Sequence, residues 1–128
     1  MTAFSNYLES EILDAAVKQG TYTGSATYLA LFTSSANLEA NIITDELSGG
    51  GYARQAIVWG TPSDGVVNNA SAITFPQATA DWSAVYAMAI MDAATGGNVL
   101  FWTPTGKKEV FASSTLNIAV AELTIVIK

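Results

Sequence analysis

The sequence contains no cysteine and no histidine. The absence of cysteine excludes disulfide bonds and thiolate metal ligands, so packing must hold the chain together. The absence of histidine removes the usual general base at neutral pH and the commonest metal ligand. Ser-His-Asp and Cys-His catalysis are therefore excluded, and we expect neither enzymatic activity nor a cofactor.

Charge is also scarce: charged residues make up 12% of the 128 residues, and the net charge is −6. Nucleic acids and anionic membranes attract clustered Lys and Arg, but only Lys107 and Lys108 are adjacent. No apolar run reaches the roughly 20 residues that span a bilayer, and the N-terminus lacks the pattern of a secretion signal. We expect neither nucleic acid nor membrane as a partner. A surface this poor in charge indicates contacts with other subunits instead.

Short apolar runs separated by turns dominate the rest of the sequence. Residues 1–20 are predicted to form one helix, capped by Ser5 or Asn6 and closed by Gly20 in a left-handed conformation. Phe4, Leu8 and Ile12 give this helix an apolar stripe. The predicted strands are 26–33, 53–59, 71–75, 82–91, 99–103, 109–112, 115–120 and 123–127.

Two of these strands are predicted to be central, because residues 26–33 are apolar on both faces and residues 82–91 form the longest apolar run. Alanine and methionine in that run also suit a helix, but its alternation favours a strand. Residues 71–75, which Pro76 follows, are predicted to form an edge strand, and residues 104–108 a turn. The whole pattern predicts an all-β fold: one antiparallel β-sandwich, jelly-roll-like, spanning 1–128 with one N-terminal helix.

A weakly patterned segment, 34–51, interrupts the series and ends in three consecutive glycines. A loop of this length in a small domain is typical of a functional or binding segment. Just after the glycines stands Arg54, the only arginine of the chain. We predict that it forms a partly buried ion pair that ties the loop of the three glycines 49–51, here called the glycine loop, to the sandwich. Its candidate partners are Glu46, Asp45 and Asp92.

Candidates for other chemistry all have an ordinary structural interpretation. Two carboxylates could hydrolyse a glycoside, but acids beside turns usually accept hydrogen bonds from backbone amides. Calcium could bind at Asp64 or in the stretch 92–98, although neither has the ligand spacing of an EF-hand. The candidate carboxylates are Asp45, Glu46, Asp64, Asp81 and Asp92. Three tryptophans could form a sugar-binding platform, but we expect Trp59, Trp82 and Trp102 to pack in the core or at an interface.

Several segments carry a family resemblance over nearly the whole chain. They are 5–9 with 12–14, 28–34, 46–55, 73–76 with 78–82, and 91–100. In this order they resemble a family of small virion structural proteins of tailed bacteriophages, described as head-decoration or tail-fibre-like proteins. The most specific parts are 46–55 and 92–98. Ser113-Ser114 and Ala121-Glu122 stand where relatives tend to have Gly-Asp turns, which affects turn details and not the fold.

The resemblance implies a virion protein without an active site, and two functions stay open. The first, which we expect, is a capsid cement or decoration protein that bridges subunits of the major capsid protein, as a homo-oligomer and preferably a trimer. The alternative is a tail or tail-fibre component involved in host attachment. The helix and the 34–51 loop would supply the interface. Its candidate residues are Phe4, Leu8, Leu38, Ile42, Ile43, Gly49, Gly50, Gly51 and Arg54.

Overall fold

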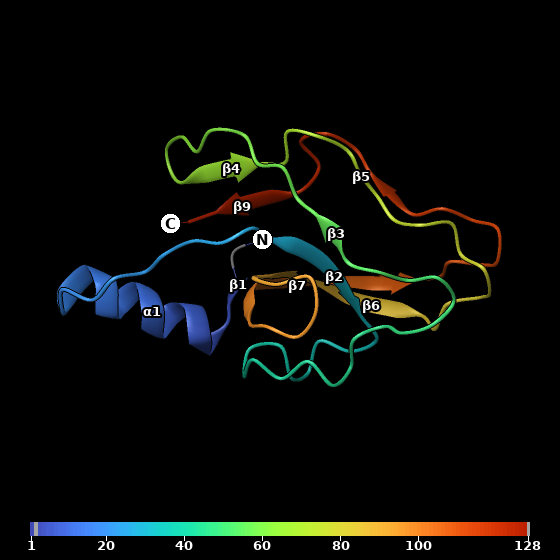
Figure 1. Ribbon diagram of the computed structural model, residues 1–128, viewed down its shortest axis with the longest axis horizontal. Helices are drawn as coiled ribbons and strands as arrows, with labels where there is room; N and C mark the ends of the chain where they lie inside the picture. Colours follow the sequence, from blue (N-terminus) through green and yellow to red (C-terminus); the bar gives the residue numbers. More distant parts are fainter. Residues whose placement is uncertain (2, 128) are drawn as a thin grey trace.

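The computed structural model describes residue 1 and residues 3–127. One α-helix and nine β-strands form in this part of the chain, and the strands make three antiparallel sheets (Figure 1). The elements are β1 (Ala3–Phe4), α1 (Asn6–Val17), β2 (Tyr28–Phe32), β3 (Gln55–Ala56), β4 (Val66–Asn68), β5 (Ile73–Thr74), β6 (Val85–Met91), β7 (Val99–Lys108), β8 (Asn117–Ile118) and β9 (Thr124–Val126). The prediction of an all-β antiparallel fold with one N-terminal helix is confirmed.

The largest sheet has five strands in the order β1-β7-β6-β2-β3. Strands β6 and β7 form a hairpin around the loop 92–98, as the sequence predicted. Strand β2 pairs with β6 along its whole length, with Ala30 opposite Ala89. Both β2 and β6 have neighbours on each side, which confirms that they are central strands. The other two sheets are the pairs β4-β9 and β5-β8.

Each face of the five-stranded sheet has its own apolar core. One face packs against the small sheets through Leu29, Leu31 and Ile90, which meet Phe75 and Ile125. The opposite face lies under the segment that follows β2, in a second cluster: Ala30, Phe32, Leu38, Ala87, Ala89, Met91 and Val99. The sheet is therefore the middle layer, with the small sheets on one side and residues 38–43 of the loop on the other (Figure 1). Three alanines in this second cluster let the loop approach the sheet closely.

The helix is shorter than predicted at both ends. Ala3–Phe4 form β1, and Ser5 is the N-cap, with its Oγ accepting a hydrogen bond from the Leu8 amide at 3.2 Å. At the other end Gln19, not Gly20, has the left-handed conformation, with φ of 61°. A Cβ on Gly20 would lie 2.5 Å from the Asp14 carboxylate, so the glycine is required for close approach instead.

Strand prediction was wrong in three places. Of the predicted strand 53–59, only Gln55–Ala56 forms a strand, which pairs with β2. After Ala56 the chain turns away from β2 toward β4. The predicted turn at 104–108 is absent, and β7 continues through Pro104 and Gly106. Beyond Trp102 one side of β7 has no partner strand among the described residues, and an edge strand tolerates proline. Residues 109–112 form no strand, because their backbone bonds to the 78–82 segment instead.

Candidate functional site

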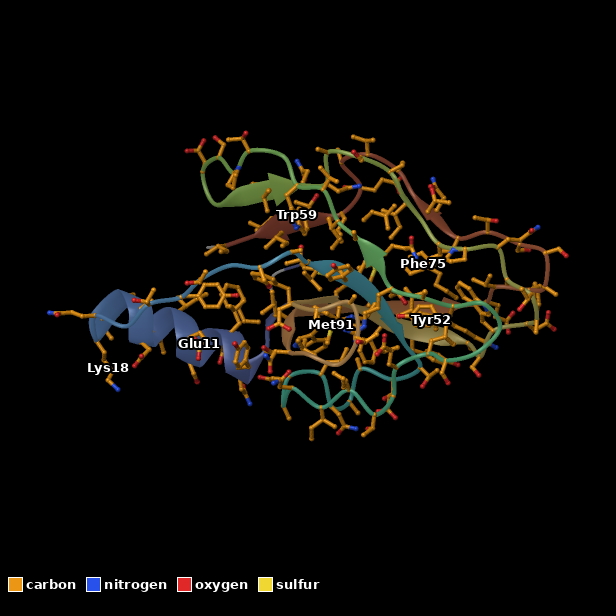
Figure 2. All side chains as sticks on the ribbon, viewed as in Figure 1. Glu11, Lys18, Tyr52, Trp59, Phe75 and Met91 are labelled. Carbon is orange, nitrogen blue, oxygen red and sulfur yellow. The ribbon has the colours of Figure 1, made fainter. Side chains whose placement is uncertain are left out.

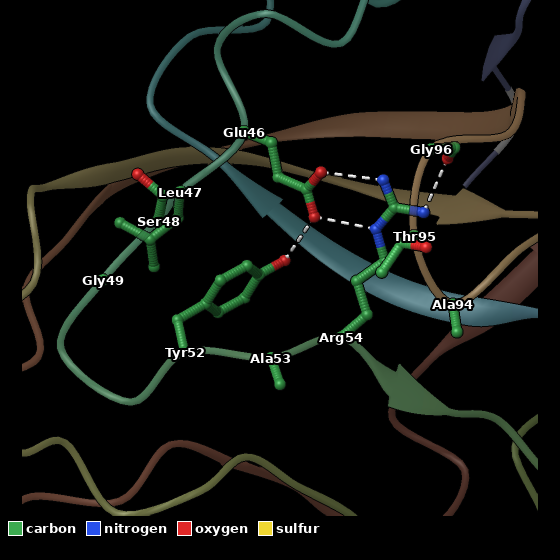
Figure 3. A pocket seen from close by; sticks show the side chains of 10 residues that line it. All are labelled: Glu46, Leu47, Ser48, Gly49, Tyr52, Ala53, Arg54, Ala94, Thr95 and Gly96. Atoms are coloured by element: carbon green, nitrogen blue, oxygen red, sulfur yellow. Dashed lines mark hydrogen bonds and ion pairs between the residues drawn. The ribbon is translucent and has the colours of Figure 1, made fainter.

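A two-pronged ion pair between Arg54 and Glu46 lies where the glycine loop meets the five-stranded sheet (Figure 3). Arg54 Nε donates to Glu46 Oε1 and Nη2 donates to Oε2, both at 2.7 Å. The side chains are 3% and 19% exposed, respectively. The predicted partly buried ion pair is confirmed, with Glu46 as the partner. Asp45 and Asp92 bond to other groups.

The glycine loop is what brings the two charges together. Glu46 lies beside β2. It forms an isolated antiparallel bridge with Phe32, and the Leu47 amide donates a hydrogen bond to the Leu31 carbonyl. The three glycines that follow, 49–51, all have positive φ and reverse the chain. Arg54 is thereby returned to a position beside Glu46. A sequence separation of eight residues becomes a direct contact because the turn between them is built of glycine.

The Tyr52 hydroxyl extends this pair into the sheet. It donates to Glu46 Oε1 at 2.9 Å and accepts a hydrogen bond from the Leu31 amide at 3.0 Å. Burial raises the pKa of Tyr52 well above its ordinary value, and the nearby Glu46 charge adds to the effect. The pKa of Arg54 is also raised, mainly by its hydrogen bond to Glu46. Tyr52 therefore stays neutral and Arg54 stays charged at neutral pH.

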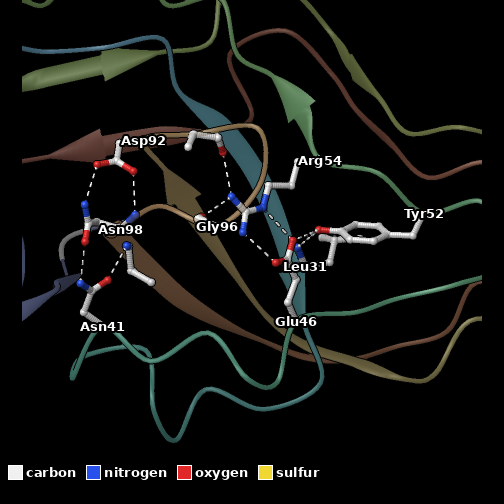
Figure 4. Close-up of polar contacts among 10 residues, drawn as sticks. Leu31, Asn41, Glu46, Tyr52, Arg54, Asp92, Gly96 and Asn98 are labelled. Carbon is white, nitrogen blue, oxygen red and sulfur yellow. Dashed lines mark hydrogen bonds and ion pairs between the residues drawn. The ribbon is translucent and has the colours of Figure 1, made fainter.

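The third guanidinium nitrogen of Arg54, Nη1, binds the loop of the β6–β7 hairpin (Figure 4). Arg54 Nη1 donates to the carbonyl oxygens of Ala93 at 2.7 Å and Gly96 at 2.8 Å. Carbonyl oxygens of two loop residues thus converge on one cation that Glu46 already neutralises. We call Arg54, Glu46, Tyr52 and these two carbonyls the arginine clasp. It joins the glycine loop, β2 and the hairpin loop.

A second set of hydrogen bonds closes the same hairpin loop from its base. Asp92 accepts from the Asn98 amide at 2.6 Å and from its side-chain nitrogen at 3.0 Å. Asn41, on the 34–51 loop, donates to Asn98 Oδ1 at 2.9 Å and accepts from the Val99 amide at 2.7 Å. The loop that covers the sheet is therefore bound to the hairpin at two places (Figure 4). These amides were not predicted, because nothing in the sequence distinguishes Asn41 from other loop asparagines.

A surface pocket of about 510 Å³ lies beside the arginine clasp. It is lined by Glu46, Leu47, Ser48, Gly49, Tyr52, Ala53, Arg54, Ala94, Thr95 and Gly96 (Figure 3). The charged atoms that border it already bond to one another or to the backbone. The exposed hydroxyls of Ser48 and Thr95 are what this wall offers to another molecule.

The other candidate residues do not gather into a site. Asp81 accepts a hydrogen bond from the Ala112 amide, and Asp64 occupies a turn with φ of 52°. In residues 1 and 3–127, no three carboxylates come close enough together to hold a metal ion. In the same part of the chain, no helix is both long and apolar enough to cross a membrane.

The three tryptophans are built into the body of the protein. Trp82 is buried and donates its indole N–H to the Gly50 carbonyl, while Trp59 donates to Thr27 Oγ1 at 2.8 Å. Trp102 packs on the second core cluster, and its indole nitrogen is buried without a partner in the described part of the chain. The rings do not form one exposed platform, because Trp82 is buried and Trp59 and Trp102 are half-buried in different segments.

The interface candidates differ in exposure. Leu8 and Leu38 lie in the chain's own core, so these side chains are not on the surface. Ile43 and Phe4 are half-buried, whereas Ile42 and Gly49 are exposed. Contacts with another subunit stay a prediction for the residues that reach the surface.

The arginine clasp thus belongs to an all-β protein in which internal contacts occupy the polar groups most able to bind a ligand. Residues 3–126 match the family described as "Podophage GP4 fiber I protein gp80", and the chain belongs to this family. It is therefore a structural protein of the bacteriophage virion. No curated protein shows a significant match to it. The family confirms the resemblance to virion structural proteins and supports the fibre alternative better than the cement hypothesis.

Proposed function

We propose that this chain is a structural module of a podophage fibre, which keeps a fixed shape in the particle and neither cleaves nor reads a host sugar. The observation that carries the proposal is the arginine clasp. Its cation, its carboxylate and its phenol are all hydrogen-bonded to groups of the same chain. A buried charged network of this kind is expensive to break and therefore rigidifies the loops that it joins.

Host attachment was the alternative function that the resemblance implied. In this proposal the chain contributes to attachment only by positioning other parts of the fibre. A rigid module in a fibre places other parts of the fibre at the cell surface without contacting the receptor itself. Sugar recognition usually employs an exposed aromatic face, and the three tryptophans form no such platform. The hypothesis of a capsid cement protein bound to the major capsid protein has no comparable support, because the family is described by its fibre.

Electron cryomicroscopy of intact particles tests the proposal. We expect density for this chain in the fibres and none on the shell between fibres. A binding assay against a panel of bacterial surface polysaccharides forms the second part, and we expect no binding. Dense coverage of the shell would overturn the fibre assignment. Polysaccharide binding that Thr95→Ala and Ser48→Ala abolish would overturn the purely structural role.

A further inference from the structure

Helix α1 projects from one end of the molecule and buries little of itself (Figures 1 and 2). Leu8 is its only buried residue, whereas Leu13 is 61% and Val17 72% exposed. A groove of about 280 Å³ runs along its base, lined by Phe4, Glu9, Ile12 and Leu13. An isolated helix of this length is marginal in water, so an exposed apolar side is a cost unless something covers it.

The opposite end of the molecule carries a protruding aromatic ring. Helix α1 begins against the start of β7, since the Ser5 amide bonds to the Leu100 carbonyl. Strand β7 then runs to Lys108, whose partner Val85 lies six residues along β6 from Met91, the partner of Val99, so β7 spans roughly 20 Å at the rise of an extended strand. Just beyond it stands Phe111, with 57% of the residue exposed.

The turn that carries Phe111 is held firmly. The Ser114 amide bonds to the Phe111 carbonyl, and the Trp82 amide bonds to the carbonyl of Val110. The Ala112 amide donates to Asp81 at 2.8 Å. Residues on both sides of the ring are thus tied to the protein body, so little backbone entropy remains to be lost if the ring binds a partner.

The two ends match in size and in charge. A cavity of about 150 Å³ already accepts a benzene ring, so a groove of about 280 Å³ has room for a phenyl side chain. Glu9 lines the groove, and Glu11 lies on the same helix. At the other end Lys107 pairs with Glu109, while Lys108 forms no ion pair within the described residues. Lys108, an unpaired cation within the described residues, thus stands three residues before Phe111, whereas the Asp81 carboxylate beside the ring is bonded to the Ala112 amide. At the other end an acid lines the groove.

We propose that the occupant of the groove is a second copy of this chain, whose Phe111 enters between Phe4, Ile12 and Leu13 while its Lys108 faces Glu9. The contact joins different surfaces of the two copies, at opposite ends of β7. Repeating it produces an open row of molecules rather than a closed dimer. The inference rests on the proposed function, because it states how such a module extends a fibre.

Sedimentation velocity of the full chain over a range of concentrations tests the contact. The wild type should form species larger than dimers. Leu13→Lys and Phe111→Glu should each raise the concentration needed for half-association at least about tenfold. Val58→Glu, at a similarly exposed apolar position outside both ends, is the control and should associate as the wild type does. Equal melting temperatures would show that each variant is folded.

Mixing the two end variants gives the sharper result. Each has one intact end, so an equimolar mixture should form heterodimers and stop there. The pair Glu9→Lys with Lys108→Glu should associate better than either single variant. A helix-to-helix contact would leave Phe111→Glu associating normally, and that result would overturn the proposal.

The outcome for this contact is separable from that for the fibre role. A wild type that stays monomeric at all concentrations, yet is found in fibres by microscopy, overturns the head-to-tail contact and leaves the proposed function standing. If the chain forms rows in solution but microscopy places it on the shell, the fibre role is overturned and the head-to-tail contact stands.

Discussion

The indole N–H of Trp82 donates to the carbonyl oxygen of Gly50 at 2.8 Å, and the ring lies so close that a Cβ on this glycine would be 2.7 Å from Trp82 Cδ1. Gly50→Ala should therefore lower the free energy of unfolding for two reasons, the backbone conformation and the steric clash. The left-handed φ of 60° costs an alanine about 1–2 kcal/mol, and displacement of the indole adds about 1–3 kcal/mol. Gly49→Ala is the matched control, because its Cβ would meet nothing within 4 Å. Equal losses in urea unfolding would contradict the close approach.

The ion pair of Arg54 predicts a large effect of a single truncation. Arg54→Met leaves the Glu46 carboxylate without its cation, which should lower the free energy of unfolding by about 3–5 kcal/mol. Lys107→Met removes an exposed pair with Glu109 and should leave the free energy of unfolding nearly unchanged, because solvent screens such a pair. Similar midpoints for the two variants in chemical denaturation would show that the buried pair contributes little.

Stability should fall at alkaline pH because of Tyr52. Its pKa is raised in the folded state, whereas an unfolded tyrosine loses its proton near pH 10. Above that pH the folded state binds more protons than the unfolded state, so the free energy of unfolding decreases as pH rises. The slope should reach about 1.4 kcal/mol per pH unit. Tyr52→Phe should be less stable at neutral pH but show a shallower alkaline slope; an unchanged slope would assign the effect to other groups.

One alanine occupies a turn that suits glycine. Ala121 has φ of 65°, in the left-handed region that favours glycine. Ala121→Gly should remove the strain of the left-handed conformation and raise stability by roughly 0.5 kcal/mol after the entropy cost of glycine. Ala119→Gly, two residues earlier and without a positive φ, should lower it. Thermal unfolding of both variants decides the sign.

Calcium should leave the protein unchanged. Asp92 uses its carboxylate oxygens on the Asn98 amide and side chain, and Asp64 lies alone in its turn. Neither is left with the several oxygen ligands that calcium needs. Melting temperatures with a chelator and with millimolar calcium are expected to agree. A rise of several degrees on adding calcium would show that a site forms after all.

The sequence could predict those parts of the fold in which one pattern dominates. Residues 82–91 alternate clearly, and their strand was predicted from that alternation. Arg54 could be predicted to pair with an acid because it is the only arginine and follows the glycines. That Arg54 pairs with Glu46 and not with Asp45 could not be predicted. The two adjacent carboxylates have the same chemistry, and the sequence does not show which side chain points toward Arg54.

Other parts depend on tertiary partners that no local pattern reveals. The sequence around Pro104 and Gly106 predicts a turn, yet β7 passes through both because one side of it has no partner strand in the part of the chain that the structure describes. The 34–51 loop has weak periodicity because it packs through single anchors such as Leu38, not through a repeating face. Asn41 acts through its side chain on a distant loop, and such a contact is visible only after the chain has folded.

The strand order also has a consequence for synthesis on the ribosome. Strand β1 pairs with β7, so Ala3 must wait for Trp102 before it can join the sheet, and β4 must wait for Thr124–Val126. Most of the chain therefore leaves the exit tunnel before any layer can close. Contacts this distant in sequence make folding slow and leave unpaired strand edges exposed to neighbours. Assembly into a particle should accordingly follow the completion of this fold and not accompany the emergence of its first strands.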